Sequence, residues 1–314
     1  MRKTVGFVLL ALGAALLAVG VVTTAWAPGV VKKTPVDVNT TTRLEGTGAR
    51  LDAETGELAA PRPVRVTSVS QVDSDASTDA DAVFVSYQCI NYTDEGETPD
   101  CISDPDDPRT FSIPEPDRFA TDRVSGEAVN DAEGLPADAV PHEGLVNKFP
   151  FDTEQRTYPV WDGLTQRAWD AEFVGVEDLE GVQTYHFRMT VPRTDVDEIA
   201  EDTPGSYANT VDIWVEPTTG SIQRQAQDQQ RWLADGTQAV DLKVDFTDEQ
   251  LARSAADAED SVASLQLVTR TMPLVGFIGG ALLLLAGAAL VLTARRKPGA
   301  GEPTPSEPRE PVSV

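Results

Sequence analysis

Apolar residues are distributed unevenly along the chain, and the two longest apolar runs lie near its ends. VGFVLLALGAALLAVGVVTTAW, within residues 5–27, and MPLVGFIGGALLLLAGAALVLTA, over residues 272–294, contain no charged residue. Each reaches the roughly twenty residues that a helix needs to cross a hydrocarbon layer of about 30 Å. The pattern therefore predicts two transmembrane helices, over 5–27 and 272–294.

Between these spans, apolar and polar residues alternate with the period of two that is typical of half-buried strands. RPVRVTSVSQV and DAVFVSYQC show the alternation first, and RAWDAEFVGV and VQTYHFRMTVP, joined by EDLEG, show it most clearly. Turn signals at EPTTG and ADG then separate NTVDIWV, SIQRQAQDQQRWL and QAVDLKVDF. We therefore expect a mainly β domain, an antiparallel meander or half-barrel over residues 28–246, between the two transmembrane α-helices.

Two internal segments and the C-terminal tail depart from this alternation. Residues 102–147 are dense in Pro, Asp and Glu, which predicts a long irregular excursion. Residues 247–271 predict a juxtamembrane helix, because Thr247 is a candidate N-cap and an alanine-rich run follows. We expect Pro273 to kink its junction with the second span. The Pro- and Glu-rich residues 295–314 predict a disordered tail.

Charged residues beside the spans predict the orientation of the chain in a cell membrane. Basic residues occur in residues 1–4 and directly after the second span, in RRK. The positive-inside rule then places both termini in the cytoplasm and residues 28–271 outside it. A cleavable signal peptide is an alternative for the first span, because AWA resembles a cleavage site. The apolar run is longer than the usual h-region of about 7 to 15 residues, which favours an uncleaved anchor.

The acidic character of the chain limits its partners. The formal net charge is −26, and nearly all acidic residues lie in the central domain. Such a charge keeps a domain soluble and repels phosphate backbones, so we expect no binding of nucleic acid.

Residues with catalytic or metal-binding chemistry are scarce. The two cysteines, Cys89 and Cys101, predict a disulfide in a domain outside the cytoplasm, worth about 3 kcal/mol by the chain-entropy argument. His142 and His186 have no neighbouring cysteine, serine or second histidine at ligand or catalytic spacing. The sequence also lacks phosphate-loop and dinucleotide fingerprints. We therefore expect no enzymatic activity, no metal and no cofactor.

Aromatic residues gather in NKFPFDTEQRTYPVWDG, directly before the clearest hairpin. Without a nucleophile or base to serve, these rings indicate either a packed core or the lining of an apolar pocket. The candidate residues, with their expected partners in the hairpin, are Phe149, Phe151, Tyr158, Trp161, Trp169, Phe173, Tyr185 and Phe187.

Glycines recur along one side of each predicted span. Small residues on one face let helix backbones approach closely in lipid, so we expect the two spans to pack together, and contacts between copies of the chain through the same faces remain an alternative. The candidate packing residues are Gly6, Gly13, Gly20, Gly276, Gly280 and Gly287.

Several of these stretches together resemble a known family. WAPGVV at the end of the first span, FPFDTEQRTYPVWDG, AEFVGVEDLEGVQTYHFRMTVP, VDIWVEPTTGSI and the closing RRK resemble the actinobacterial membrane proteins of the porin PorA family. The resemblance covers nearly the whole chain and implies a cell-envelope protein. A membrane β-barrel needs strands of about ten residues with a lipid-facing apolar band, and we expect shorter strands here.

Three functions remain open from the sequence. The first is an anchored β domain that binds or passes a hydrophobic envelope component, such as a lipid. The second is an assembly factor that holds partner proteins at the membrane, and the third is a porin-like channel.

Overall fold

The computed structural model describes residues 2–96, 98–113, 116–200 and 202–293, so the predicted disordered tail lies outside the described residues. The chain divides into two compact units. The helical unit comprises Met1–Pro28 and Gln266–Val314, and the β unit comprises Gly29–Leu265.

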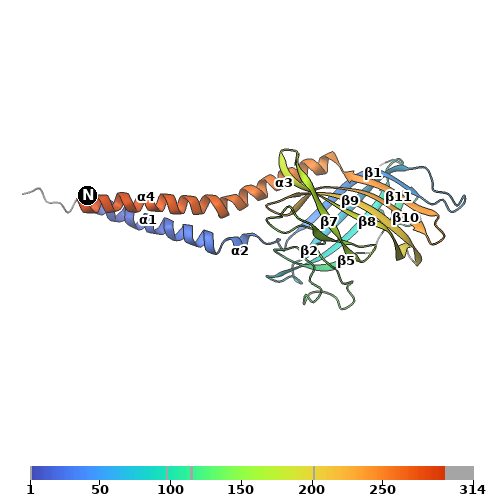
Figure 1. The fold of residues 1–314 in the computed structure, drawn as a ribbon, viewed down its shortest axis with the longest axis horizontal. Helices are drawn as coiled ribbons and strands as arrows, with labels where there is room; N and C mark the ends of the chain where they lie inside the picture. The colour runs from blue at the N-terminus through green and yellow to red at the C-terminus, as the bar shows by residue number, and fades with distance from the viewer. Residues whose placement is uncertain (1, 97, 114–115, 201, 294–314) are drawn as a thin grey trace, which may run out of the picture. The chain divides into compact units, whose positions relative to one another are not determined.

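The helical unit is a pair of long helices that lie side by side, α1 (Arg2–Ala25) and α4 (Met272–Thr293) (Figure 1). The short α2 (Pro28–Val31) follows α1. Before α4, the helix α3 (Asp248–Gln266) continues through a π-helical turn at Leu267–Thr271. The chain therefore remains helical from α3 into α4, and the kink expected at Pro273 stays a prediction.

The β unit is a single eleven-stranded sheet in which every strand pair is antiparallel, so the expected mainly β fold between two apolar helices is confirmed. The strand order is β4-β3-β2-β1-β11-β10-β9-β8-β7-β6, and β5 pairs with β3. The strands are β1 (Asn39–Arg50), β2 (Arg62–Asp73), β3 (Asp81–Tyr92), β4 (Thr110–Ser112), β5 (Asp117–Asp122), β6 (Tyr158–Asp162), β7 (Arg167–Leu179), β8 (Val182–Ala200), β9 (Thr203–Glu216), β10 (Ser221–Leu233) and β11 (Gln238–Phe246).

The sheet joins two runs of sequential strands. One contains β1 to β5 and the other β6 to β11, and they meet where β1 pairs with β11, from Leu44 opposite Phe246 to Arg50 opposite Val240 (Figure 1). The first and last strands of the β unit are therefore neighbours near the middle of the sheet.

Two expectations about the strands are wrong. The strands are not short, because β1, β2 and β3 have 12 residues each and β8 has 19. The predicted irregular excursion over residues 102–147 also contains β4 and β5. Their few apolar residues, around Phe111 and Phe119, gave too short an alternation to be recognised in the sequence.

Side chains on one face of the sheet, which we call the inner face, form two apolar clusters. The first lies over β6 to β9 and the second over β1, β2, β3 and β11, with Phe111 of β4 packed into it. The buried residues of the first cluster are Leu145, Phe149, Tyr158, Val160, Ala171, Phe187, Met189, Val191, Tyr207, Val211, Ile213 and Val215. Those of the second are Leu44, Val64, Val66, Ile90, Tyr92, Phe111, Leu242 and Val244.

The segment before β6 covers part of the inner face. The backbone N–H of Leu145 donates to Pro159, and that of Phe149 donates to the carbonyl of Gly220. Gly220 has a positive φ of 74°, and a Cβ there would lie 2.1 Å from the carbonyl oxygen of Phe149. This close approach requires glycine in the turn between β9 and β10.

Helix α3 is attached to the sheet at both its start and its middle. The Thr247 hydroxyl accepts a hydrogen bond from the Gln250 N–H at 3.0 Å, which makes Thr247 the N-cap. Gln250 accepts a bond from the Arg43 N–H of β1, and Ala255 and Ala258 pack with Val182 of β8.

Candidate functional site

The two membrane helices pack glycine against glycine. A Cβ atom on Gly13 would lie 2.8 Å from the carbonyl oxygen of Gly280, and one on Gly276 would lie 2.7 Å from the Cα of Gly20. The helix backbones therefore touch, as small residues allow. The six candidate packing glycines are all buried: Gly6, Gly13, Gly20, Gly276, Gly280 and Gly287.

The outward side chains of this helix pair are apolar. Phe7, Leu12, Leu282 and Leu285 each expose more than half of their surface. After Lys3, no charged residue occurs in α1, and none occurs in the described α4. The helices of one chain therefore suit a lipid environment but do not line a polar path between them.

Six of the eight candidate aromatic residues meet on the inner face. Ring centroids of Phe149, Tyr158 and Phe187 lie 4.8 to 5.7 Å apart, and these three side chains are at most 3% exposed. The rings contact one another and fill the first cluster. Trp169, Phe173 and Tyr185 pack against this cluster from partly buried positions.

The other two candidate aromatic residues, Phe151 and Trp161, lie outside that cluster. The Trp161 ring packs in a tilted arrangement on His142, with ring centroids 4.4 Å apart. His142 is itself buried, and its Nε2 lies 2.9 Å from Asp117. Phe151 lies beneath the ammonium group of Lys148, whose Nζ is 3.7 Å from the ring centroid.

Lys148 is a largely buried cation, and no carboxylate among the described residues forms an ion pair with it. Its Nζ donates to the hydroxyl of Thr34 at 3.2 Å, and the Asp122 carboxylate lies further away. Burial lowers the pKa of Lys148 to about 8, and the negative charge of Asp122 opposes this effect. The Thr34 N–H also donates to the Arg123 carbonyl, and the Thr34 carbonyl accepts from the Arg123 guanidinium. These bonds hold the segment before β1 in place.

A buried pair of polar groups lies at the edge of the first cluster. The Tyr207 hydroxyl donates to Asp162 Oδ2 at 2.7 Å, and Asp162 Oδ1 accepts from the backbone and hydroxyl of Thr165. Burial and the adjacent Asp162 carboxylate raise the pKa of Tyr207 far above its ordinary value. The phenol therefore remains a donor at every physiological pH.

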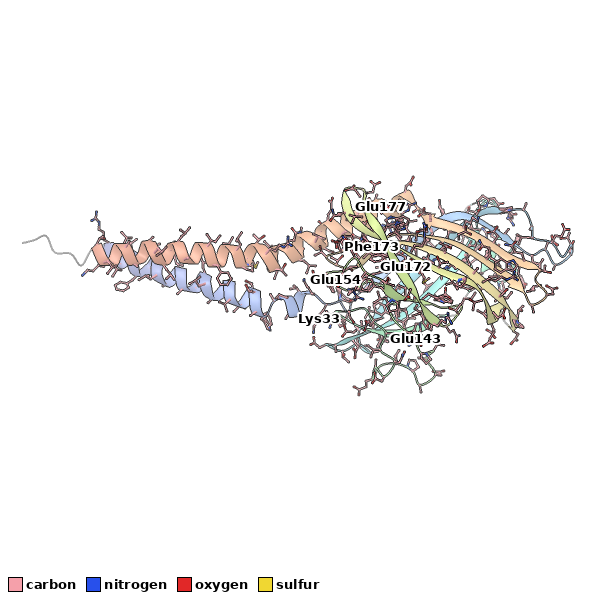
Figure 2. The ribbon with its side chains drawn as sticks, in the orientation of Figure 1. Lys33, Glu143, Glu154, Glu172, Phe173 and Glu177 are labelled. Atoms are coloured by element: carbon pink, nitrogen blue, oxygen red, sulfur yellow. A yellow bond between two sulfur atoms is a disulfide. The ribbon has the colours of Figure 1, made fainter. Side chains whose placement is uncertain are left out.

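The opposite face of the sheet, which we call the outer face, carries a network of charged groups around His186. The His186 ring nitrogens lie 2.6 Å from Asp212 and 3.0 Å from Glu177, and the ring stacks on Trp214 at 4.4 Å. Glu177 of β7, which is labelled in Figure 2, also accepts a hydrogen bond from the Trp214 indole N–H. Arg188 donates to Asp212 at 2.8 Å. Each of these five side chains has at least one partner in the network, and among the described residues no serine, threonine or cysteine side chain bonds to them.

Other ion pairs continue along the outer face. Arg224 binds Asp245, and Lys243 lies 3.3 Å from Asp228. A sheet that faced lipid would carry an apolar band at these positions. The outer face is therefore suited to water rather than to hydrocarbon.

A row of amide side chains separates the two apolar clusters on the inner face. Gln225, Gln227 and Gln229 of β10 alternate along the strand, and Asn209 of β9 lies directly opposite Gln229. Asn209 is 5% exposed, and its side-chain oxygen has no hydrogen-bond partner within the described parts of the chain.

The predicted disulfide is confirmed. Cys89 of β3 and Cys101 are joined, with their Cα atoms 5.5 Å apart. Two surface hollows lie near this loop and near the start of α3, and both are lined mainly by polar and charged residues, Arg65 among them. Neither hollow has the apolar lining expected of a lipid pocket.

Sequence reasoning missed the amide row and the Asp162–Tyr207 pair. The alternating glutamines of SIQRQAQDQQRWL were visible, but their position depends on the strands that flank β10. Within the described residues, no group of three or more His, Cys, Asp or Glu side chains is arranged to hold a metal.

Comparison with known proteins adds the family. The sequence model described as Porin PorA matches residues 5–289. A protein of Corynebacterium amycolatum called Porin PorA is 32% identical over 74 residues, which is 23% of this chain and 19% of that protein. The match to this relative thus covers about a fifth of its length. Because the family match extends over both apolar helices and the whole sheet, the chain belongs to the porin PorA family.

Proposed function

We propose that this membrane protein is a non-enzymatic binding protein of the cell envelope. In this proposal both termini lie in the cytoplasm, and the β unit lies on the other side of the membrane. The single observation that supports it most is the arrangement of the chain. Along the chain, the β unit, Gly29–Leu265, lies between two apolar helices that pack together, which is the order expected of a domain anchored at both of its ends.

The bonding of the β unit favours binding over catalysis. The ionisable groups of the His186 network and the Asp162–Tyr207 pair are engaged with one another, and neither group includes an activated nucleophile. The acidic surface of the unit suits an exposed position in water.

A hydrophobic envelope component is one ligand class for such a protein, and partner proteins are another. The rings of Phe149, Tyr158 and Phe187 pack against one another and are at most 3% exposed, which disfavours an apolar ligand between them. We therefore expect the purified full-length protein to carry no stoichiometric lipid in its β unit. Mass spectrometry of protein extracted from native membranes would detect such a lipid. A bound lipid that is lost on Phe187→Asp substitution would contradict this expectation and support the apolar-ligand hypothesis.

Topology is tested by labelling intact cells with a membrane-impermeant maleimide. We expect Glu54→Cys, in an exposed turn of the β unit, to react, and Ser313→Cys, near the C-terminus, to react only after the cells are lysed. Labelling of Ser313→Cys in intact cells would overturn the proposed orientation.

The family description favours a second function, the passage of solutes. One helix pair provides no polar lining, so conduction requires several copies of the chain or a partner. Planar-bilayer recordings of the purified, reconstituted full-length protein test whether it conducts solutes. We expect no discrete conductance steps, and reproducible steps that disappear in a Gly280→Leu variant would establish a channel of assembled helices.

A further inference from the structure

One side of β7 is unpaired over the second half of the strand. The pairing of β6 with β7 ends where Tyr158 lies opposite Ala171, whereas β7 continues to Leu179 beside β8. Among the described residues, no strand or loop forms a backbone hydrogen bond with the free side of residues 172–179. We call this stretch the β7 edge. Figure 2 labels three of its residues, Glu172, Phe173 and Glu177.

The β7 edge is apolar at its centre and open to approach. Val174 and Val176 expose 52% and 48% of their surfaces. Between them, a Cβ atom on Gly175 would meet nothing within 4 Å, and the φ of Gly175 lies outside the left-handed region. Neither crowding nor backbone conformation therefore requires glycine there. A glycine inside a strand often marks a place where another backbone approaches closely.

Other open stretches of the sheet are protected. β4, at the opposite end, has only three residues. The free side of β5 is bonded at Ala120 and Asp122 to the loop of residues 127–129. β8 is unpaired with β7 beyond Met189, but this stretch contains Pro192 and, up to its end, no apolar side chain as exposed as the two valines. Edge strands are commonly kept from pairing by short length, proline or a covering loop, and the β7 edge has none of these.

Charges along the β7 edge indicate the kind of strand that fits it. Glu172 and Asp178 flank the two valines, and neither carboxylate forms an ion pair among the described residues. Antiparallel pairing of two copies about Gly175 would place Glu172 of each copy opposite Asp178 of the other, which is destabilising. The register with β8 also shifts between Phe173 and Gly175, as at a β-bulge, which opposes a regular ladder between two copies. A strand with basic residues near its ends avoids the repulsion.

We propose that the β7 edge binds an extended segment of a partner protein, in which apolar or β-branched residues stand between basic ones. This segment adds a strand to the sheet beside β7. Main-chain hydrogen bonds supply affinity in complexes of this kind, and side-chain contacts supply specificity. The apolar residues of the segment cover Val174 and Val176, and its basic residues lie near Glu172 and Asp178. The assignment rests on the proposed binding function and gives the partner a chemical class.

Three peptides test the proposal on the full-length protein in a neutral detergent, at about 0.15 M salt, where attraction between distant charges is largely screened. In the first peptide, valine and threonine alternate between two terminal lysines. The second has glutamates in place of the lysines. The third keeps the lysines but has proline in place of one central valine and the adjacent threonine, so it lacks N–H groups on both sides of its backbone. Fluorescence polarisation measures the Kd of each labelled peptide.

We expect the lysine peptide to bind, and the glutamate and proline peptides to bind at least tenfold more weakly. Amide hydrogen exchange, followed by mass spectrometry, should slow in residues 172–179 when the lysine peptide is bound, and should not change in residues 193–200 of β8. Val176→Lys replaces an apolar contact by a repelling charge and should weaken binding at least tenfold. Glu172→Lys should weaken binding of the lysine peptide about threefold or more and strengthen that of the glutamate peptide.

Val140→Lys is the matched control for Val176→Lys. Val140 is a valine of similar exposure, 43%, in the segment between β5 and β6. Its substitution adds the same charge and should change the Kd less than twofold. Both variants should keep the melting temperature of the unaltered protein, because each valine is about half exposed. A loss of binding then does not reflect unfolding.

Several results would overturn the inference. They are no binding of the lysine peptide, equal binding of the proline peptide, equal effects of Val176→Lys and Val140→Lys, and no slowing of exchange in residues 172–179. Self-association of the peptide-free protein that is lost in Val176→Lys would also overturn it, because the β7 edge would then bind a second copy of the chain. The topology labelling with Glu54→Cys and Ser313→Cys involves neither a peptide nor β7, so it tests the proposed function independently.

Discussion

Replacing Lys148 with methionine is expected to stabilise the protein, although it removes a hydrogen bond and a contact with an aromatic ring. The Lys148 ammonium group is largely buried, donates to Thr34 at 3.2 Å and lies 3.7 Å above the Phe151 ring. Burial nevertheless lowers the pKa of Lys148 to about 8, so these contacts do not compensate for the lost hydration. Methionine keeps the length and apolar stem of the side chain and carries no charge.

The lowered pKa gives the magnitude. A fall from 10.5 to about 8 corresponds to about 3 kcal/mol, at roughly 1.4 kcal/mol for each pH unit. The charged form is disfavoured in the folded state, so the unfolded chain binds the proton more tightly. Stability therefore rises with pH between about 8 and 10.5, and below about 8 the full cost of the buried charge is present.

The assay is thermal unfolding of the full-length protein in detergent, followed by tryptophan fluorescence at several pH values from 6 to 11. At pH 7 we expect Lys148→Met to raise the melting temperature by about 6 to 12 °C, since about 3 kcal/mol is involved and a domain of this size shifts roughly 2 to 4 °C per kcal/mol. The difference from the unaltered protein should shrink as the pH passes from 8 to 10.5.

Lys243→Met is the matched control. The Lys243 side chain is 57% exposed and lies 3.3 Å from Asp228 on the outer face, where ion pairs contribute about 0 to 1 kcal/mol. Its effect should be small at every pH. A loss of stability in Lys148→Met that is the same at pH 7 and pH 10.5 would refute the reasoning, because it would show that the contacts with Thr34 and Phe151 outweigh desolvation.

Three further outcomes follow from the structure. Replacing both disulfide cysteines by serine should lower the stability of the β unit by about 2 to 4 kcal/mol, measured by thermal unfolding with and without reductant. Gly280→Leu should separate the membrane helices and speed hydrogen exchange in α1, whereas Gly279→Leu, where a Cβ meets only a leucine methyl at 3.6 Å, should not. Tyr207→Phe should cost about 1.5 to 3 kcal/mol in chemical denaturation, because the buried Asp162 carboxylate loses its phenol donor, and an unchanged midpoint would contradict this role.

The strand pattern was predictable because local alternation is strong from β7 onward. The hairpin of β7 and β8, the next three strands and the helix after Thr247 all follow from the period of side chains and from turn residues. The sequence did not predict β4 and β5. β4 has only three residues, and both strands pair with β3 across a long acidic loop. Their pairing depends on distant residues and not on their own sequence.

The candidate site was less predictable than the fold. The burial of Phe149 and Phe187 agreed with their apolar character, but Trp161 packs on His142 instead, because position 161 lies on the opposite face of β6 from Tyr158. The amide row depends on cross-strand register. Gln227 is unusual only because Val211 and Val244 flank it, and these come from different strands.

The pairing of β1 with β11 has a consequence for the synthesis of the chain. β1 is made among the first fifty residues, but its partner from Gln238 to Phe246 follows almost two hundred residues later. Until then one edge of β1 exposes unpaired backbone groups, and an open edge of this kind can pair with another chain. Completion of the sheet is therefore a late, long-range step. It can occur only after the chain has been made as far as the end of β11. Of the helices, α3 and the second membrane helix then remain to be made.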